Sequence, residues 1–185
     1  MKKLQITIIL LFVGIVANAQ FKIGGKLAYG TEIKSLGLGV KATYPINDKL
    51  TASGELNYFF ESDESSENTM GSYSFGGYSN SVTNDRSTKL ITFNTDLHYS
   101  LPFSSFDFYA IGGVNFSNVS IESSSSGGGM SSTPFSNSET FVGLNLGIGG
   151  FIPINNDLDF FSELKYIASD FNQLVFSAGV LYRIN

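Results

Sequence analysis

Apolar and polar residues alternate along most of this chain, and clusters of turn residues interrupt the alternation at intervals. Successive side chains of a β-strand point to opposite faces, so strict alternation predicts strands with one apolar and one polar face. A strand that crosses a bilayer at a tilt needs about 9–11 residues, and every alternating segment reaches that length. The predicted strands span residues 21–30, 33–44, 49–60, 89–101, 106–118, 138–151, 158–168 and 173–184.

Three of the interruptions begin with a proline that is followed within two residues by Asn or Ser, at Pro45, Pro102 and Pro153. Proline fixes φ at the first position of a tight turn, so the pattern predicts three short hairpin connections. The first and third turns also lead to the same motif, Glu-Leu-x-Tyr, which begins ten residues after the proline, at Glu55 and at Glu163. We interpret this as a repeated hairpin.

Two other connections, residues 61–88 and 119–137, are long and polar. Barrels of the outer membrane have short turns on the periplasmic side, long loops outside, and strands that alternate between lipid and lumen. The sequence therefore predicts an all-β fold, an eight-stranded antiparallel up-and-down transmembrane β-barrel. Its proline turns would face the periplasm, and the two long polar segments would form outer loops.

Residues 1–19 have the features of a cleavable signal peptide. Two lysines precede a short apolar run, and Ala17 and Ala19 form a small-residue cleavage motif. We expect cleavage before Gln20, which leaves one mature domain, the outer-membrane β-barrel of residues 20–185. The apolar run is too short for a spanning helix, and no other run approaches its length.

Composition and charge exclude several classes of protein. Charged residues make up 15% of the chain, against roughly 25% in typical soluble domains. Without the two signal-peptide lysines, 9 basic residues oppose 16 acidic ones, a formal charge of −7, which argues against nucleic-acid binding. The chain has no cysteine, which excludes a lipoprotein anchor, disulfides and thiolate metal sites. We expect no cofactor and no metal.

Charged residues within the strands fall on the face opposite the apolar one. That face would line the lumen, which in an eight-stranded barrel is just wide enough for side chains. Because buried charges must pair, we interpret the two glutamates of this face as partners of Lys41, Lys26 or Arg183 in a structural plug. A narrow ion path or gate is the alternative. The predicted lumen cluster consists of Lys26, Lys41, Glu55, Asp96, Glu163, Lys165 and Arg183.

Aromatic residues gather near both ends of the predicted strands, where barrels carry girdles at the two membrane boundaries. The alternative interpretation is that aromatic residues simply favour strands. The predicted inner girdle consists of Tyr44, Tyr99, Phe106, Phe160 and Tyr182, and the outer girdle of Tyr29, Tyr58, Phe60, Phe116 and Tyr166.

With its signal peptide, strand periodicity, repeated turn and closing strand, the chain resembles the small eight-stranded outer-membrane proteins of the OmpA/OmpX-like β-barrel group. The resemblance covers residues 20–185 and implies a place in the outer membrane of a Gram-negative-type bacterium, in contact with its lipid. The closing residues 176–185 are similar to the C-terminal signal read by the outer-membrane barrel assembly machinery. That signal usually ends on an aromatic residue, whereas this chain ends on Asn185, preceded by Tyr182 and Ile184.

The single histidine belongs to the triplet His98-Tyr99-Ser100, which is similar to the His-x-Ser pair of outer-membrane lipid A deacylases. In those enzymes His is the base and Ser the nucleophile, and a third group, here Asp96, would have to orient the base. A match of three residues arises easily in a serine-rich chain. We therefore predict no enzymatic activity and keep lipid A modification as an alternative.

Four acidic residues of the first long connection, Glu61, Asp63, Glu64 and Glu67, carry oxygen ligands that could hold Ca²⁺. Their spacing matches no EF-hand pattern, so we interpret them as a solvated loop.

The leading hypothesis is a non-enzymatic barrel that acts in envelope structure, adhesion or binding of an extracellular partner through residues 61–88 and 119–137, because loops on rigid frames carry recognition. A narrow porin-like channel is one alternative. Another is a soluble lipid carrier of lipocalin-like shape, since periodicity alone does not say which face is inward. The ligand and the oligomeric state are not predicted.

Overall fold

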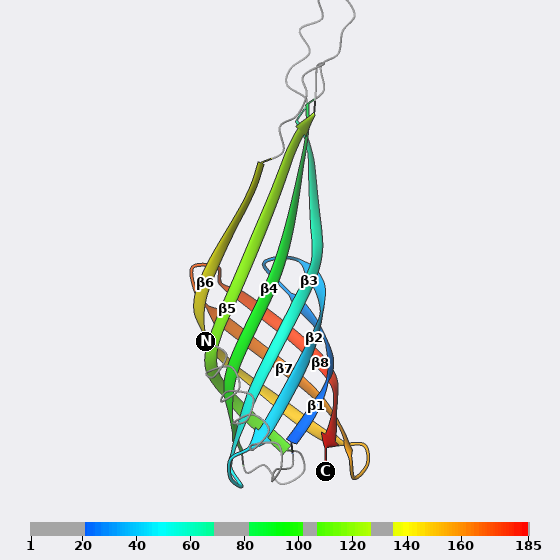
Figure 1. Cartoon of the computed structure of the whole chain (residues 1–185), viewed down its shortest axis with the longest axis vertical. Coiled ribbons are helices and arrows are strands. Elements are labelled where there is room, and N and C mark those ends of the chain that lie inside the picture. The colour runs from blue at the N-terminus through cyan, green and yellow to red at the C-terminus, as the bar shows by residue number, and fades with distance from the viewer. Residues whose placement is uncertain (1–20, 69–81, 102–106, 127–134, 185) are drawn as a thin grey trace, which may run out of the picture.

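The chain closes into a single antiparallel β-barrel (Figure 1). The computed structural model describes residues 21–68, 82–101, 107–126 and 135–184, with side chains for all of these except 62–68, 82–86, 123–126 and 135. Each strand pairs with its neighbours in sequence, and β1 pairs with β8 to close the sheet. The predicted eight-stranded antiparallel up-and-down barrel is therefore confirmed. The strands are β1 (Phe21–Gly30), β2 (Ser35–Pro45), β3 (Leu50–Asn68), β4 (Val82–Ser100), β5 (Asp107–Ser126), β6 (Phe135–Pro153), β7 (Leu158–Ala168) and β8 (Gln173–Ile184).

Three strands, β1, β7 and β8, have the bounds that the alternation predicts. The second strand begins at Ser35, two residues later than predicted, because the chain turns at Lys34. Lys34 has a φ of 51°, in the left-handed region that no β-strand uses. Ile33, which the prediction placed in the strand, instead turns inward from this turn and is buried.

The four central strands are longer than predicted. β3 and β4 pair as far as Asn68 and Val82, and β5 and β6 pair as far as Ser123 and Phe135. The prediction that residues 61–88 and 119–137 are entirely loops is therefore wrong. Alternation of apolar and polar residues reports contact with lipid or a core, not backbone pairing, so it stops where the apolar surface stops while the hydrogen-bonded ladder continues.

These longer strands rise above the rest of the barrel as a four-stranded sheet, which Figure 1 shows at its upper end. We call this part the strand extension; it comprises residues 60–68, 82–89, 119–126 and 135–143. β2 pairs with β3 no further than Phe59, and β7 pairs with β6 no further than Leu144. A register shift between Phe59 and Ser62 places a β-bulge at the base of the extension.

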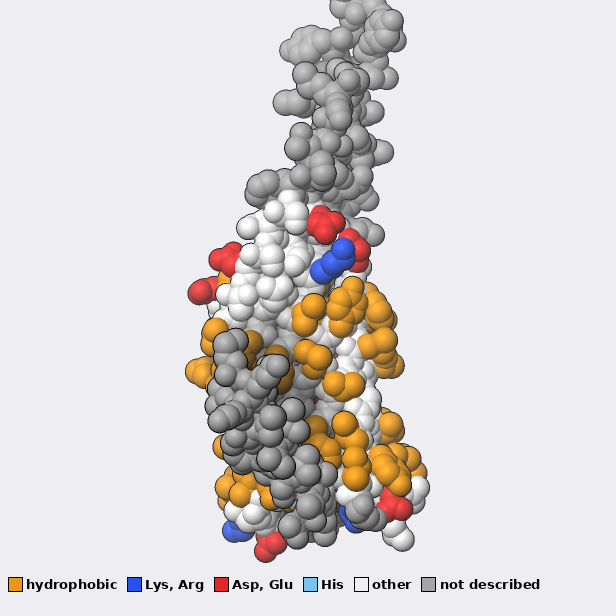
Figure 2. Space-filling view, viewed as in Figure 1, with side chains coloured by type: hydrophobic (Ala, Val, Ile, Leu, Met, Phe, Trp, Pro, Cys, Tyr) orange, Lys and Arg blue, Asp and Glu red, His pale blue; other side chains and the backbone are white. Residues whose placement is uncertain are grey.

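Large apolar side chains cover the outer wall of the barrel. Residues such as Leu27, Leu38 and Val142 expose half or more of their surface. Figure 2 shows these side chains as a band around the described part of the wall, with charged side chains at its two ends. None of the described residues forms a helix that could span a membrane.

Two of the three proline turns lie within the described residues, and they have the same geometry. The side-chain Oδ1 of Asn47 accepts hydrogen bonds from the backbone N–H groups of Lys49 and Leu50, both at 2.9 Å. Asn155 Oδ1 accepts the two equivalent bonds of the other turn, also at 2.9 Å. The third turn, residues 102–106, and the predicted signal peptide with its cleavage site lie outside the described residues.

Candidate functional site

Six charged side chains meet in the middle of the lumen, and they balance as three lysines and three carboxylates. Glu55 accepts from the Nζ atoms of three lysines: Lys26 at 2.5 Å, Lys41 at 2.8 Å and Lys165 at 2.7 Å. All four side chains have at most 2% of their surface exposed. Because a buried charge is stable only when it is paired, the cluster ties β1, β2, β3 and β7 together through one carboxylate.

The remaining two carboxylates complete this lumen charge cluster. Glu163 pairs with Lys41 and accepts a hydrogen bond from the Tyr109 hydroxyl at 2.8 Å. Asp96 pairs with Lys165 at 2.8 Å and so links β4 to β7 across the lumen. Six of the seven predicted lumen residues thus lie in one cluster. Arg183, the seventh, is half-buried and makes no ion pair within the described part of the chain.

Glycines on neighbouring strands give these side chains their space. Asp96 lies opposite Gly113 in the strand register, and a Cβ on Gly113 would lie 2.2 Å from Asp96 Oδ1. Lys165 lies opposite Gly147, and a Cβ there would lie 2.9 Å from Lys165 Cγ. A larger residue at either glycine would therefore displace a member of the cluster.

A layer of neutral polar side chains, which the sequence prediction missed, lies beside the charges. Asn94 Oδ1 accepts from Asn115 at 2.7 Å and from Asn145 at 2.9 Å, and Asn145 also donates to Asp96 at 2.6 Å. The signal was present in the sequence, because these residues share the strand face of the predicted charges. We call this the amide layer; it comprises Asn57, Thr92, Asn94, Asn115, Ser117 and Asn145, all buried.

Toward the strand extension the lumen becomes apolar. Ile33 from the β1–β2 turn packs among the buried apolar side chains there. Phe141 of β6 stacks on Phe171 of the β7–β8 turn, with ring centroids 6.1 Å apart. The two short turns thus contact the base of the extension. The apolar layer comprises Ala28, Ile33, Phe59, Leu90, Val119, Ile167 and Val175.

At the other end of the lumen, near the proline turns, aromatic rings stack against the charge cluster. Tyr109 lies between His98 and Phe151, with ring centroids 4.5 and 4.6 Å away. Lys22 pairs with Asp159 at 2.5 Å beside these rings. The lumen thus has four kinds of lining in succession along its length.

The geometry around His98 differs from that of a catalytic triad. Its Nε2 lies 3.8 Å from Glu163 Oε1, and both ring nitrogens lack a hydrogen-bond partner among the described residues. Asp96 does not orient it, since its two oxygens accept from Asn145 and Lys165. Ser100 is exposed at the strand end, whereas His98 is buried.

The four acidic residues interpreted as a solvated loop, with Ca²⁺ binding as the alternative, instead lie on β3 in the strand extension. Glu61 pairs with Lys89 at 3.6 Å and accepts a hydrogen bond from Ser87. Glu122 approaches Lys89 from the other side, also at 3.6 Å. The side chains of the other three acids lie outside the described residues, and no group of acidic or histidine side chains suited to a metal occurs among those described.

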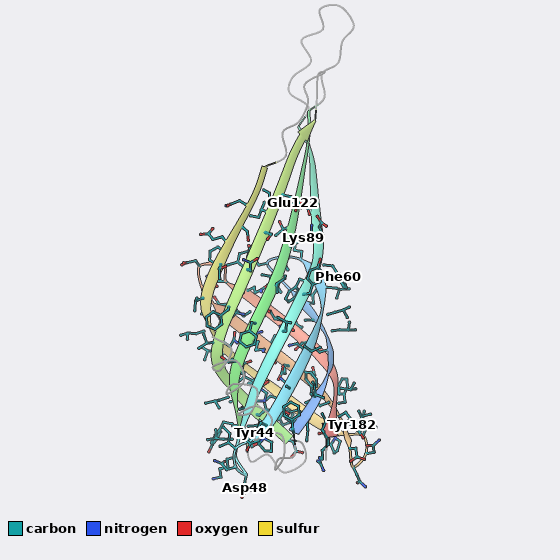
Figure 3. The ribbon with its side chains drawn as sticks, in the orientation of Figure 1. Tyr44, Asp48, Phe60, Lys89, Glu122 and Tyr182 are labelled. Carbon is teal, nitrogen blue, oxygen red and sulfur yellow. The ribbon has the colours of Figure 1, made fainter. Side chains whose placement is uncertain are left out.

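Eight of the ten aromatic residues predicted as girdles expose their side chains on the outer wall. Figure 3 shows Phe60 toward the upper end, beneath Lys89 and Glu122, and Tyr44 and Tyr182 toward the lower end, above Asp48. Tyr44 is half-buried, and Phe106 lies outside the described residues. The outward-facing members are Tyr29, Tyr58, Phe60, Tyr99, Phe116, Phe160, Tyr166 and Tyr182.

A closed barrel with an apolar outer band and a polar interior defines the class of integral β-barrel membrane proteins, because closure leaves no unpaired backbone in the lipid. The chain belongs to the family of the outer membrane protein beta-barrel domain, whose model matches residues 12–183. It is therefore a protein of the Gram-negative outer membrane. No curated protein sequence matches the chain.

Solved structures of outer-membrane proteins share the fold at low sequence identity. A major outer membrane protein from Thermus thermophilus has a TM-score of 0.63 and 14% identity, over 90% of this chain and 100% of that one. The N-terminal β-barrel domain of Pseudomonas aeruginosa OprF has a TM-score of 0.53 and 10% identity, with 90% and 100% covered. Ail, the attachment invasion locus protein of Yersinia pestis, has a TM-score of 0.52 and 14% identity, with 90% and 97% covered.

Proposed function

We propose that this protein is a non-enzymatic outer-membrane barrel that binds an extracellular protein partner through its strand extension, in adhesion or in envelope structure. The main support is that β3–β6 extend beyond β2 and β7. Residues 60–68 of β3 and 135–143 of β6 therefore form strand edges that pair with no described neighbouring strand. Unpaired edges offer backbone N–H and C=O groups to which another chain can add a strand. Short turns are periplasmic in such barrels, so the extension projects outside.

The outward face of the extension supports a protein partner. On β5 and β6 four of its side chains are neutral and hydrogen-bonded across the strands: Asn118 donates to Thr140 at 3.1 Å and Ser120 to Ser138 at 3.2 Å. The charge of Glu122, next along the same face of β5, is paired with Lys89. Ail has been crystallised in complex with the heparin analogue sucrose octasulfate, a polyanion. A polyanion is a poor match here, because the chain has a formal net charge of −5.

The direction of the backbone groups on the β6 edge follows from the ladder. Leu101 N donates to the Phe108 carbonyl at 2.8 Å, and hydrogen-bonded pairs alternate along antiparallel strands. The odd-numbered residues of β6 therefore bond to β5, and the N–H groups of Ser136, Ser138 and Thr140 point toward the open edge.

Replacing Thr140 with proline is expected to abolish partner binding without unfolding the barrel, because proline removes an N–H that only an added strand would use. Cells that lack the gene would be complemented with wild type, T140P or T140A, and their adhesion to immobilised extracellular proteins compared. T140A is the matched control, since it also loses the hydrogen bond from Asn118. Adhesion by T140P at the wild-type level would contradict strand addition, as would a deletion strain that adheres normally.

We also propose that the lumen is closed and acts as a structural plug, the interpretation made from the sequence. The proposal is supported by the paired charge cluster and by the apolar layer, which would oppose passage of hydrated ions. Purified barrel in planar bilayers is expected to give no conductance steps, with an E55Q/K26M variant as a comparison that leaves the apolar layer in place. Regular steps from the wild type would favour the porin-like alternative.

A further inference from the structure

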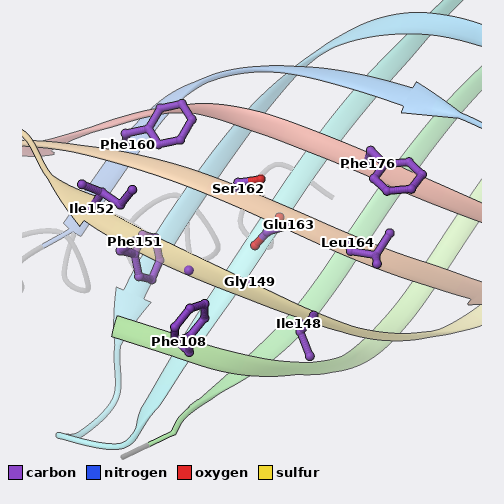
Figure 4. A pocket seen from close by; sticks show the side chains of 11 residues that line it. Phe108, Ile148, Gly149, Phe151, Ile152, Phe160, Ser162, Glu163, Leu164 and Phe176 are labelled. Carbon is purple, nitrogen blue, oxygen red and sulfur yellow. The ribbon is translucent and has the colours of Figure 1, made fainter. Parts of the chain in front are cut away.

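A groove of about 390 Å³ crosses the lipid-facing wall of the barrel on β5–β8. Figure 4 shows Ser162 between Phe160 and Ile152 on one side and Leu164 and Phe176 on the other, with Phe108 at one end. The volume falls in the range of about 300–1,000 Å³ that is usual for ligand sites. Its lining is mostly apolar, with Ser162 and Glu163 as the polar residues.

The groove follows one row of the strand register, in which Phe108 lies at one end and the small residues Gly150 and Ser162 line the groove. Phe108 of β5 lies opposite Gly150, Gly150 opposite Ser162, and Ser162 opposite Ala178. The outward residues two positions away along the same strands are large; they are Ile148 and Ile152 on β6, Phe160 and Leu164 on β7, and Phe176 and Val180 on β8. The wall is therefore low along this row and high on both sides of it.

The glycine in this row is not required by packing. A Cβ on Gly150 would lie 3.4 Å from the nearest atom, Phe108 Cδ1, which is an ordinary contact, and its φ is not in the left-handed region. By contrast, a Cβ on the adjacent lumen glycine, Gly149, would lie 2.5 Å from Tyr109 Cζ. Glycine in a strand lowers stability, and at Gly150 it relieves no steric clash. What the missing side chain of Gly150 does provide is the space of the groove.

The position of the row in the membrane indicates what fills it. Phe108 is next to the first residue of β5, Gly150 is three residues from the end of β6, Ser162 is four from the start of β7, and Ala178 is six from the end of β8. All these strand ends lie at the proline-turn side, which is periplasmic in such barrels. The row thus climbs from the periplasmic boundary toward the middle of the bilayer.

We propose that this groove holds one acyl chain of a phospholipid of the periplasmic leaflet as a fixed lipid. A chain from that leaflet has its head at the boundary and its tail toward the bilayer centre, as the row does. The groove is continuous with the lipid-facing surface, so a lipid reaches it without displacing protein. The projecting rings of Phe160 and Phe176 would keep the flat wall of a second barrel off its floor.

The test is native mass spectrometry of the mature barrel released from micelles that contain palmitoyl-oleoyl phosphatidylethanolamine. The wild type is expected to retain one phospholipid. Gly150→Leu fills the groove and is expected to lower the retained fraction by at least about tenfold, an affinity loss of about 1.4 kcal/mol. Gly54→Leu is the matched control, because Gly54 has no atom within 4 Å of its Cβ position and lies on β3, away from the groove.

A gel-mobility difference between unboiled and boiled samples verifies that each variant is folded. If G150L does not fold, Ser162→Val makes the same test with a residue that favours strands. The proposal is overturned by a wild type that retains no lipid, by equal retention in G150L and G54L, or by loss in both. In micelles that contain lipid A as well, retention of lipid A in preference to the phospholipid would also overturn the proposal, because it would place the site in the other leaflet.

Discussion

Replacing Glu55 with glutamine is expected to lower the free energy of unfolding by about 3–5 kcal/mol, because breaking a buried ion pair leaves an uncompensated charge. Glu55 accepts from three buried lysines. Without its charge, those lysines face only two carboxylates in a place that water does not reach. The measurement is urea unfolding of the barrel in detergent micelles, followed by circular dichroism, since the chain has no tryptophan.

Two variants make this prediction specific. E61Q removes the charge of an exposed glutamate that pairs with Lys89 at 3.6 Å, and it is expected to leave unfolding unchanged, because exposed pairs contribute little. E55Q/K26M restores the charge balance and is expected to recover part of the lost stability. The account of the cluster would be wrong if E55Q and E61Q unfolded at the same urea concentration.

Replacing Gly24 with alanine is expected to prevent the barrel from closing. A Cβ on Gly24 would lie 1.7 Å from the carbonyl oxygen of Val180, at the seam between β1 and β8. Backbone cannot move aside as a flexible side chain can, so the cost should exceed the usual 1–3 kcal/mol of overpacking, at about 3 kcal/mol or more. G24A should therefore lose the gel-mobility difference between unboiled and boiled barrel.

The neighbouring glycine provides the control. Gly25 points to the outer wall, and the nearest atom to its Cβ position is the Gly39 carbonyl oxygen at 4.0 Å. G25A should fold normally and gain about 0.5–1 kcal/mol, because alanine has less backbone freedom to lose than glycine. Equal folding of G24A and G25A would show that the seam tolerates a side chain and would remove the steric argument.

Strand positions could be predicted from the sequence only where one face of the strand contacts lipid or a core, because only there do apolar and polar residues alternate. The bounds of β1, β7 and β8 follow from the alternation because these strands end where the apolar band ends. Residues 62–68 and 82–88 pair as strands without an apolar face, and a polar sequence carries no periodic signal for such pairing. The repeated turn was readable because Asn47 and Asn155 satisfy their turns locally, through bonds to residues two and three positions on.

In the lumen, too, part of the arrangement was predictable from the sequence and part was not. Parity along each strand identified the charged residues that face inward, but not which of them meet. Lys41 and Glu163 are 122 residues apart, and Lys165 and Asp96 are 69 apart, so their contacts depend on how far the strands are staggered when the sheet closes. Arg183 has the parity of the cluster yet stays outside it, because its place on β8 is nearer the rim.

By itself, the sequence determined the number of strands, the apolar and the polar face of each strand, the set of charges that share the polar face and the positions of the short turns. These are properties of neighbouring residues, set by a side-chain period of two and by local turn bonds. Only the tertiary structure decided the pairing within the charge cluster, the apolar layer, the height of the extension and the groove on β5–β8. Each of these features depends on the register between strands. No single segment specifies that register, because it is set only when all eight strands close into the barrel.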